Sequence, residues 1–431
     1  MNETPQHELF EPAPLLTRNA RLVLWALVAL GAAAFFFASP ARAWQIYLVN
    51  WLFWSGLAVV GVVIAAIWRV TNAQWSRPLR GIALATVGFV PAAFVLFLPL
   101  AAAKRYIFPW MGHTPPHRAV WMEPNFVLWR NFVALLVFYA AAAVYAYFLL
   151  RPHLGAANLP ADASLAGRLR AFVTRNWQGF DAEQARAERI LRRMTTPLLI
   201  LYTLVMSLVA FDLVMPVDPR FASTLFGGYY FVTILYTGWA LIAVLVALWL
   251  KREPRLAALI TSDELHQLGK LVFGFCMLYG MVFWSQYLVW WYGNLLEEIP
   301  YVMLRQNTMP WSPISYGMAL ITLPLPFAIL LSVAVKKNPR TLAAVCGLIV
   351  AGMWLERWVL VVPSLWTFAQ GAGGEVAHAA VAEPAAAPVS LPLGPVELLI
   401  TLGFAAAFLL SYAAFARAFP ITLGIPPRET H

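Results

Sequence analysis

The strongest constraint on the fold of this chain is a series of about ten apolar stretches, each roughly 20 residues long and nearly free of charge. Such stretches predict membrane spans, because only an α-helix or a closed β-barrel satisfies every backbone polar group in hydrocarbon. They are continuously apolar rather than alternating, which favours helices over barrel strands. The predicted spans lie near Arg21 to Ser39, Tyr47 to Trp68, Gly81 to Ala103, Phe126 to Leu150, Thr195 to Met215, Ala222 to Leu250, Leu268 to Tyr292, Pro313 to Val335, Thr341 to Val362 and Pro395 to Phe419.

The composition agrees with an all-α integral membrane protein. Of the 431 residues, 61% are hydrophobic and only 12% are charged, whereas soluble domains carry about 25% charged residues. The mean hydropathy is +0.70. The 19 Trp, 28 Phe and 15 Tyr residues are typical of lipid-facing helices with aromatic belts at both interfaces. We therefore predict a single membrane domain over residues 21–419.

The chain is poor in metal ligands. Its two cysteines, Cys276 and Cys346, both lie in apolar runs. Two cysteines exclude a disulfide framework, an iron–sulfur cluster and covalently attached haem held by this chain alone. His113 and His117 share the loop after the third span, but a zinc or copper site needs further ligands. We therefore expect no metal site, and any redox metals would belong to partner proteins.

The distribution of the 30 Lys and Arg residues predicts the orientation. With the N-terminus inside, 21 fall on the inner side and seven on the outer side, while Lys270 and Arg357 lie within spans. Basic residues concentrate on cytoplasmic loops, so both termini are predicted to be cytoplasmic. An Ala-x-Ala pattern at Ala41 to Ala43 also fits a cleaved secretory signal, but the acidic tail and the length of the first span favour a retained helix.

Four further segments complete the predicted organisation. Residues 1–20 and 420–431 are predicted to be cytoplasmic tails. Residues 151–194 form an inner loop rich in arginine, which a basic amphipathic helix on anionic lipid explains most simply. Residues 363–394 contain no Lys or Arg and are rich in Ala and Pro, which is typical of an external linker without a core of its own.

Ionisable residues at membrane depth are costly, so each is a candidate functional residue. In the predicted topology the fifth, seventh and ninth spans run outward, and their polar residues collect in or just beyond the outer half of the membrane. They are Asp212 in the fifth span, Gln286, Asn294, Glu297 and Glu298 in or just after the seventh, and Glu356 and Arg357 in the ninth.

These residues also have structural explanations. Glu356 and Arg357 can neutralise each other, Asp212 can cap a helix end, and the two glutamates after the seventh span can be solvated at the interface. Alternatively, pairing of the acids with Arg357 would hold the bundle together. The residues alone leave these interpretations open.

Several segments together carry a family resemblance. The most specific are Asp212-Leu-Val-Met-Pro-Val-Asp218-Pro-Arg-Phe-Ala-Ser-Thr-Leu-Phe-Gly227 with Tyr229 and Tyr230, and the stretch from Leu268-Gly-Lys270 through Ser285-Gln-Tyr287 to Trp291-Tyr-Gly-Asn294-Leu-Leu-Glu297-Glu298. Weaker ones are Phe108-Pro-Trp110, Asn72-Ala-Gln-Trp75-Ser-Arg77-Pro and Arg357-Trp358. The chain resembles the ActF family, the integral quinone-associated subunits of bacterial Alternative Complex III, which are relatives of NrfD- and PsrC-type membrane subunits. It departs from the family pattern at Leu213, Pro216 and Leu296.

The resemblance implies two four-helix bundles with two flanking helices in the bacterial inner membrane. It also implies a subunit of a complex that oxidises menaquinol or ubiquinol, in which iron–sulfur and multihaem cytochrome subunits on the outer side take the electrons. By this resemblance, the chain would hold no metal cofactor of its own but could contact the quinone. It would also bind another integral membrane subunit.

Quinol oxidation releases two protons, so an acceptor carboxylate near the ring must change its protonation state. Asp212 and Glu356, with Arg357 beside the latter, are the candidates for such a proton path. The candidates for a quinone-associated site are Gln286, Asn294, Glu297 and Glu298.

Two other functions stay open. A secondary transporter or proton channel without redox partners would use the same buried acids to couple ion and solute. A structural membrane anchor would use them only for packing.

Overall fold

The computed structural model confirms an all-α membrane architecture. It describes residues 14–111, 119–156, 164–219, 221–295, 299–369, 391–419 and 421. Within these residues no β-strand occurs. Ten helices there are long and apolar enough to cross a membrane, judged by length and composition. The prediction of ten helical spans is therefore confirmed.

Most spans are single helices. They are α1 (Arg18–Phe37), α2 (Pro40–Val70), α6 (Pro124–Ala156), α8 (Phe180–Val209), α9 (Phe226–Arg252), α10 (Ser262–Gly293), α15 (Pro339–Ala369) and α17 (Pro395–Ala418). A π-helical turn, η5 (Ala210–Val214), and the 3₁₀ turn η6 (Met215–Val217) continue α8. Shorter helices between spans are α5 (Lys104–Ile107), α7 (Leu165–Thr174), α11 (Ile299–Gln306), α14 (Val333–Lys337) and the 3₁₀ helix η7 (Pro254–Ala258).

The third and eighth spans are broken by proline. The third consists of η1 (Gln74–Leu79), α3 (Arg80–Leu84), η2 (Ala85–Phe89), α4 (Val90–Val95) and η3 (Leu98–Ala101). The eighth consists of α12 (Trp311–Thr322) and α13 (Pro324–Leu330). Pro91, Pro99 and Pro324 lie at the first positions of α4, η3 and α13. Proline lacks the N–H that would continue the preceding helix, and this accounts for the breaks.

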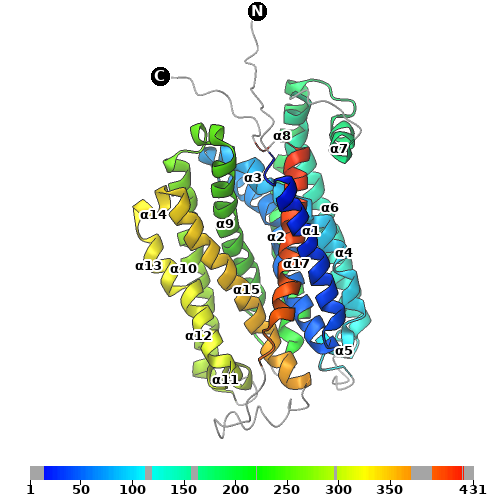
Figure 1. The fold of residues 1–431 in the computed structure, drawn as a ribbon, viewed down its shortest axis with the longest axis vertical. Coiled ribbons are helices and arrows are strands. Elements are labelled where there is room, and N and C mark those ends of the chain that lie inside the picture. The colour runs from blue at the N-terminus through cyan, green and yellow to red at the C-terminus, as the bar shows by residue number, and fades with distance from the viewer. Residues whose placement is uncertain are drawn as a thin grey trace, which may run out of the picture.

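The spans form two groups of four, with two helices outside them (Figure 1). One group contains α2, the third span, α6 and α8. The other contains α9, α10, the eighth span and α15. The groups meet where α2 contacts α9 and α15, and α1 lies along α17 on the outside. This arrangement is the one that the resemblance implied.

Small residues allow the closest helix contacts. A Cβ atom on Gly61 of α2 would lie 1.7 Å from the carbonyl oxygen of Ala83. A Cβ atom on Gly31 of α1 would lie 3.0 Å from the Cα atom of Gly403 in α17. Close backbone approach of this kind is the usual basis of helix association in lipid.

The two ends of the bundle differ. We call the end where α1 begins and α17 ends the terminal end, and the opposite end the distal end. At the terminal end, the Arg151 guanidinium donates to both carboxylate oxygens of Glu183 at 2.7 Å and to the carbonyl oxygen of Val173 at 2.9 Å. Arg170 of α7 donates to the carbonyl oxygens of Arg417 and Ala418. These bonds hold α7, in the predicted basic loop, against α6, α8 and α17.

At the distal end, Arg42 of α2 donates to both carboxylate oxygens of Glu397 in α17, at 2.7 and 2.9 Å. The ninth span continues to Ala369, beyond its predicted end at Val362. Most of the predicted external linker, residues 370–390, lies outside the described residues, as do the two predicted tails at residues 1–13 and 422–431.

The orientation predicted from the basic residues can be tested with exposed positions at the two ends. Asn307 lies between α11 and α12 at the distal end, and Arg189 lies on α8 at the terminal end. We expect Asn307→Cys to react with an impermeant thiol reagent in intact cells, and Arg189→Cys only after permeabilisation. The native Cys276 and Cys346 are buried and serve as the unreactive background. The opposite labelling pattern would reverse the orientation.

Candidate functional site

The acids predicted from the sequence occupy separate clusters in different helix groups. Asp212 lies in the π-helical turn η5, and only 3% of it is exposed. The Arg130 guanidinium of α6 donates to both of its carboxylate oxygens, with Nε at 2.7 Å from Oδ2. The side-chain amide of Asn131 donates to the same carboxylate at 2.6 Å. Asp212 therefore joins α8 to α6 and does not contact Arg357.

Arg130 is also held on its other side. Its Nη1 atom donates to the carbonyl oxygen of Trp121 at 2.7 Å, and its guanidinium carbon lies 3.9 Å from the centre of the Trp121 ring. A cation over an indole face is favourable because of the ring quadrupole. The Arg130 side chain is 12% exposed, so it reaches the edge of the packed region while Asp212 does not.

Glu356 and Arg357 form the centre of a second cluster, inside the other helix group. Arg357 donates from Nη1 to Glu356 Oε2 at 2.8 Å and from Nη2 to the Thr233 hydroxyl. The Tyr229 hydroxyl donates to Glu356 Oε1 at 2.5 Å. The Arg357 guanidinium lies 4.2 Å from the centre of the Tyr230 ring. The exposed fractions of Glu356 and Arg357 are 1% and 2%, so the pair is buried.

A row of hydroxyl groups continues from this pair towards the middle of the bundle. The ring of Tyr279 on α10 lies 6.0 Å from that of Tyr229, and its hydroxyl lies 3.4 Å from the Thr322 hydroxyl. Tyr236 stacks on Tyr279 at 5.5 Å and donates to the Thr322 carbonyl oxygen at 3.0 Å. We call these residues the Glu356 network: Tyr229, Thr233, Tyr236, Tyr279, Thr322, Glu356 and Arg357. They come from α9, α10, α12 and α15, the four elements of one helix group.

A third polar cluster lies at the distal end of the same group. Arg305 of α11 donates to the carbonyl oxygens of Val359 and Leu360, each at 2.8 Å, and to the Ser364 hydroxyl at 3.1 Å. Ser364 donates to the buried carboxylate of Asp218 at 3.2 Å. Burial raises the pKa of Tyr301, which lies under the Arg305 guanidinium, to about 12. The Tyr301 phenol therefore stays protonated near neutral pH.

The predicted quinone-associated residues do not form a cluster among the described residues. Gln286 is 5% exposed, and its Nε2 atom has no hydrogen-bond partner in the described part of the chain. Asn294 is exposed, ends α10 and has a φ of 45°. Glu297 and Glu298 lie outside the described residues, and so do His113 and His117.

Two cavities lie apart from the Glu356 network. One, of about 440 Å³, lies between α1, α2, the third span and α17, and its lining includes Phe35, Trp44 and Phe404. The other, of about 510 Å³, lies towards the terminal end, and its lining includes Trp68 and Trp239. Both are large enough for a small apolar ligand. Neither lining includes a residue of the Glu356 network.

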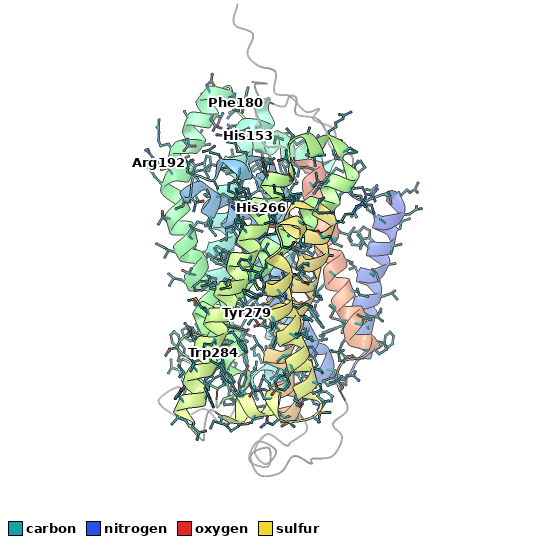
Figure 2. The ribbon with its side chains drawn as sticks, turned by 90° about the vertical axis from the view of Figure 1, so that its left-hand side faces the viewer. His153, Phe180, Arg192, His266, Tyr279 and Trp284 are labelled. Atoms are coloured by element: carbon teal, nitrogen blue, oxygen red, sulfur yellow. The ribbon has the colours of Figure 1, made fainter. Side chains whose placement is uncertain are left out.

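Among the described residues no group of three or more His, Cys, Asp or Glu side chains could hold a metal ion. Proton transfer is the chemistry that the Glu356 network can perform, because a carboxylate and several phenols take up and release protons. Figure 2 shows Tyr279 towards the end opposite to His153 and Phe180, which places this chemistry away from the terminal end.

The partners of both acids were not predicted from the sequence. Arg130 is one of the seven basic residues counted on the outer side, and Asn131 is not among the predicted site residues, although both lie in the first turns of the fourth span. Tyr229 enters only through the family resemblance, and Thr233, one turn later in the same span, is not among the predicted site residues. The useful signal was the spacing of Tyr229, Thr233 and Tyr236 by three or four residues, which places them on one helical face.

The pairing of Asp212 with Arg130 predicts an asymmetric response to mutation. Arg130→Met leaves a buried carboxylate without a counterion and is expected to cost about 3–5 kcal/mol of unfolding free energy. Asp212→Asn should cost less, because Arg130 is nearer the surface and keeps its contacts with Trp121. The double variant Arg130→Met/Asp212→Leu should recover most of the loss, as measured by thermal unfolding in detergent. Equal losses for the single variants without recovery would contradict the pairing.

No family model matches the sequence, and no match is found among curated proteins. The function must therefore be argued from the chemistry of the buried polar residues and from the membrane architecture that surrounds them.

Proposed function

We propose that this chain is an integral membrane subunit of a quinol-oxidising respiratory complex of the quinol:cytochrome c oxidoreductase type, and that it provides a path for protons. The observation that carries the proposal is the Glu356 network. It links a buried ion pair to a row of hydroxyl groups within one four-helix group. Buried ionisable groups of this kind in membrane helices mark proton relays.

The chemistry of quinol oxidation fits such a network. A quinol that becomes a quinone loses two electrons and two protons. The electrons would pass to iron–sulfur and haem groups on partner subunits, and the protons need a base that can take them up and release them. Glu356 has a phenol as its donor on one side and a guanidinium on the other. Together they keep it hydrogen-bonded in either protonation state, which suits a relay position.

The direction of the path follows from the position of Glu356. It lies 17 residues after the start of α15 and 13 before its end, or roughly 25 and 20 Å along the helix axis. In the orientation predicted from the basic residues, the nearer, distal end faces outward. Both termini would then be cytoplasmic, the membrane would be the bacterial inner membrane, and the protons would leave towards the side that carries the proposed cytochrome partners.

A secondary transporter or proton channel is the second candidate function. The cavity of about 440 Å³ between α1, α2 and α17 favours it, because a transporter needs space for a solute within the membrane domain. The apolar cavity lining would suit an apolar solute. In that case Glu356 would couple proton movement to the solute without redox partners. A purely structural anchor would require neither the cavity nor the row of hydroxyl groups.

Substitutions within the network test the proton path. Glu356→Gln retains the shape and still accepts the Tyr229 hydrogen bond, but it cannot exchange a proton. We expect at least a tenfold slower quinol-dependent cytochrome reduction by the intact complex, in line with typical acid–base contributions of about 10²–10⁴. Tyr229→Phe removes only the donor to Glu356 and should slow the reaction with the ion pair left in place.

Tyr202→Phe is the matched control for Tyr229→Phe. Tyr202 is equally buried, but its hydroxyl donates to the Phe231 carbonyl oxygen at 2.7 Å and meets no carboxylate. It should leave the rate unchanged. If Glu356→Gln prevents assembly, Tyr229→Phe still decides the question. Unchanged rates for Tyr229→Phe and Glu356→Gln across the pH range, in an assembled complex, would leave the Glu356 network with a structural role.

The partners can be tested independently of any variant. We expect the tagged chain, purified in mild detergent, to bring down a second multispan protein together with subunits that show the absorption bands of haem. The physical reason is that quinol oxidation needs electron carriers, and the two cysteines of this chain are too few for an iron–sulfur cluster or covalently attached haem. A stable monomer that takes up solute in liposomes would refute this proposal and support the transporter.

A further inference from the structure

Lys336 differs from the other buried cations of the structure. Four Lys or Arg residues are buried in the described part of the chain: Arg151, Arg305, Lys336 and Arg357. The three arginines each donate to carboxylate, hydroxyl or carbonyl oxygens. Lys336 is 7% exposed, its ammonium nitrogen reaches the surface of the bundle, and no described residue accepts a hydrogen bond from it or forms an ion pair with it. A cation at the edge of an apolar bundle that has no counterion in the protein can bind an anion from the surrounding lipid.

The surroundings hold the Lys336 side chain in a fixed place. Its methylene stem passes over Gly269 of α10, where an added Cβ atom would come within 2.7 Å of Lys336 Cγ. The ammonium nitrogen lies 5.6 Å from the centre of the Phe273 ring, on the same face of α10. Gly269 therefore provides the space for the stem, and Phe273 supports the charged end by a cation–π contact.

Further hydrogen-bonding and charged groups gather beside Lys336. His266 lies one turn before Gly269 on α10, and its Nδ1 atom is buried without a partner among the described residues. His266 interacts electrostatically with Lys336, Lys270 and Lys337. Of the acids nearby, Asp263 pairs with Lys337 at 3.5 Å, and Glu264 is engaged in capping α10 through Thr261. The local charge is therefore positive, and the neighbouring carboxylates are already used.

The position of the site identifies the kind of anion. It lies where α10 begins and where α14 ends, at the terminal end (Figure 1). Figure 2 shows His266 towards the same end as His153 and Phe180. Beside the cluster, towards the membrane interior, the apolar side chains of Leu331 and Val333 are 57% and 52% exposed. A ligand that joins a phosphate to acyl chains would match both the cationic groups and this exposed apolar surface.

We propose that Lys336, His266 and Lys270 form a binding site for the phosphate group of an anionic phospholipid between α10 and α14. The Lys336 ammonium and His266 Nδ1 contact the phosphate oxygens, Lys270 adds charge, and the acyl chains lie along Leu331 and Val333. This site lies away from the Glu356 network and does not depend on the proposed redox function.

The test compares thermal unfolding of the full chain in two nanodiscs. One contains phosphatidylcholine alone, and in the other a third of it is replaced by phosphatidylglycerol. A ligand at about a hundred times its Kd raises Tm by about 3 °C for a chain of 431 residues, and we expect that shift for the wild type. Lys336→Met retains the stem and should lose more than half of the shift. In phosphatidylcholine alone its Tm should stay close to that of the wild type, because the Lys336 ammonium group forms no ion pair or hydrogen bond with the described residues and the methionine keeps the apolar stem.

Lys337→Met is the matched control, since Lys337 is adjacent, exposed and already paired with Asp263. It should retain most of the shift. The proposal is overturned if Lys336→Met keeps the full shift, if it lowers Tm in phosphatidylcholine alone, or if the wild type does not distinguish the two lipids. A shift produced by inorganic phosphate in phosphatidylcholine nanodiscs would assign the site to a soluble phosphate compound instead.

Discussion

The cost of burying charge inside an apolar bundle governs the arrangement of this protein. Burying an unpaired ion costs several kcal/mol even after relaxation. Four buried carboxylates, Asp212, Glu183, Glu356 and Glu397, each pair with an arginine, at both ends of the bundle and within it. Three of these pairs join two different helices, α2 with α17, α6 with α8 at the terminal end, and α6 with the π-helical turn after α8. They therefore fix how the helices are set against one another.

The ion pair of Glu356 and Arg357 does not by itself join two helices. Its two members are neighbours on one helix, so their attraction does not hold α15 to any other element. The contacts that cross between helices are the hydrogen bonds from Tyr229 to Glu356 and from Arg357 to Thr233. An apolar pair at these two positions would pack the group without any desolvation cost. This is why we assign proton transfer to Glu356 and a structural role to Asp212.

The sequence predicts the number and type of the spans well, because hydropathy over about 20 residues is a local property. It does not predict which spans are neighbours. Arg130 and Asp212 are 82 positions apart in the chain, and only the packing of α6 against α8 brings them together. The hypothesis that Asp212 pairs with Arg357 failed for this reason. The sequence also does not predict that Lys336 is buried, because its position after an apolar span is the same as that of a lysine that extends to the lipid headgroups.

The prolines supply much of the polarity inside this apolar bundle. A proline cannot donate to the carbonyl oxygen four residues earlier, and that oxygen then needs another donor. Pro326 frees the carbonyl oxygen of Thr322, which accepts the hydrogen bond of Tyr236 at 3.0 Å. Pro363 likewise frees that of Val359, which accepts from Arg305 at 2.8 Å. The Glu356 network and the cluster around Arg305 thus each include a carbonyl oxygen that a proline leaves without its helical donor. These prolines are uncharged, yet they provide hydrogen-bond acceptors on both sides of the buried ion pair of Glu356 and Arg357.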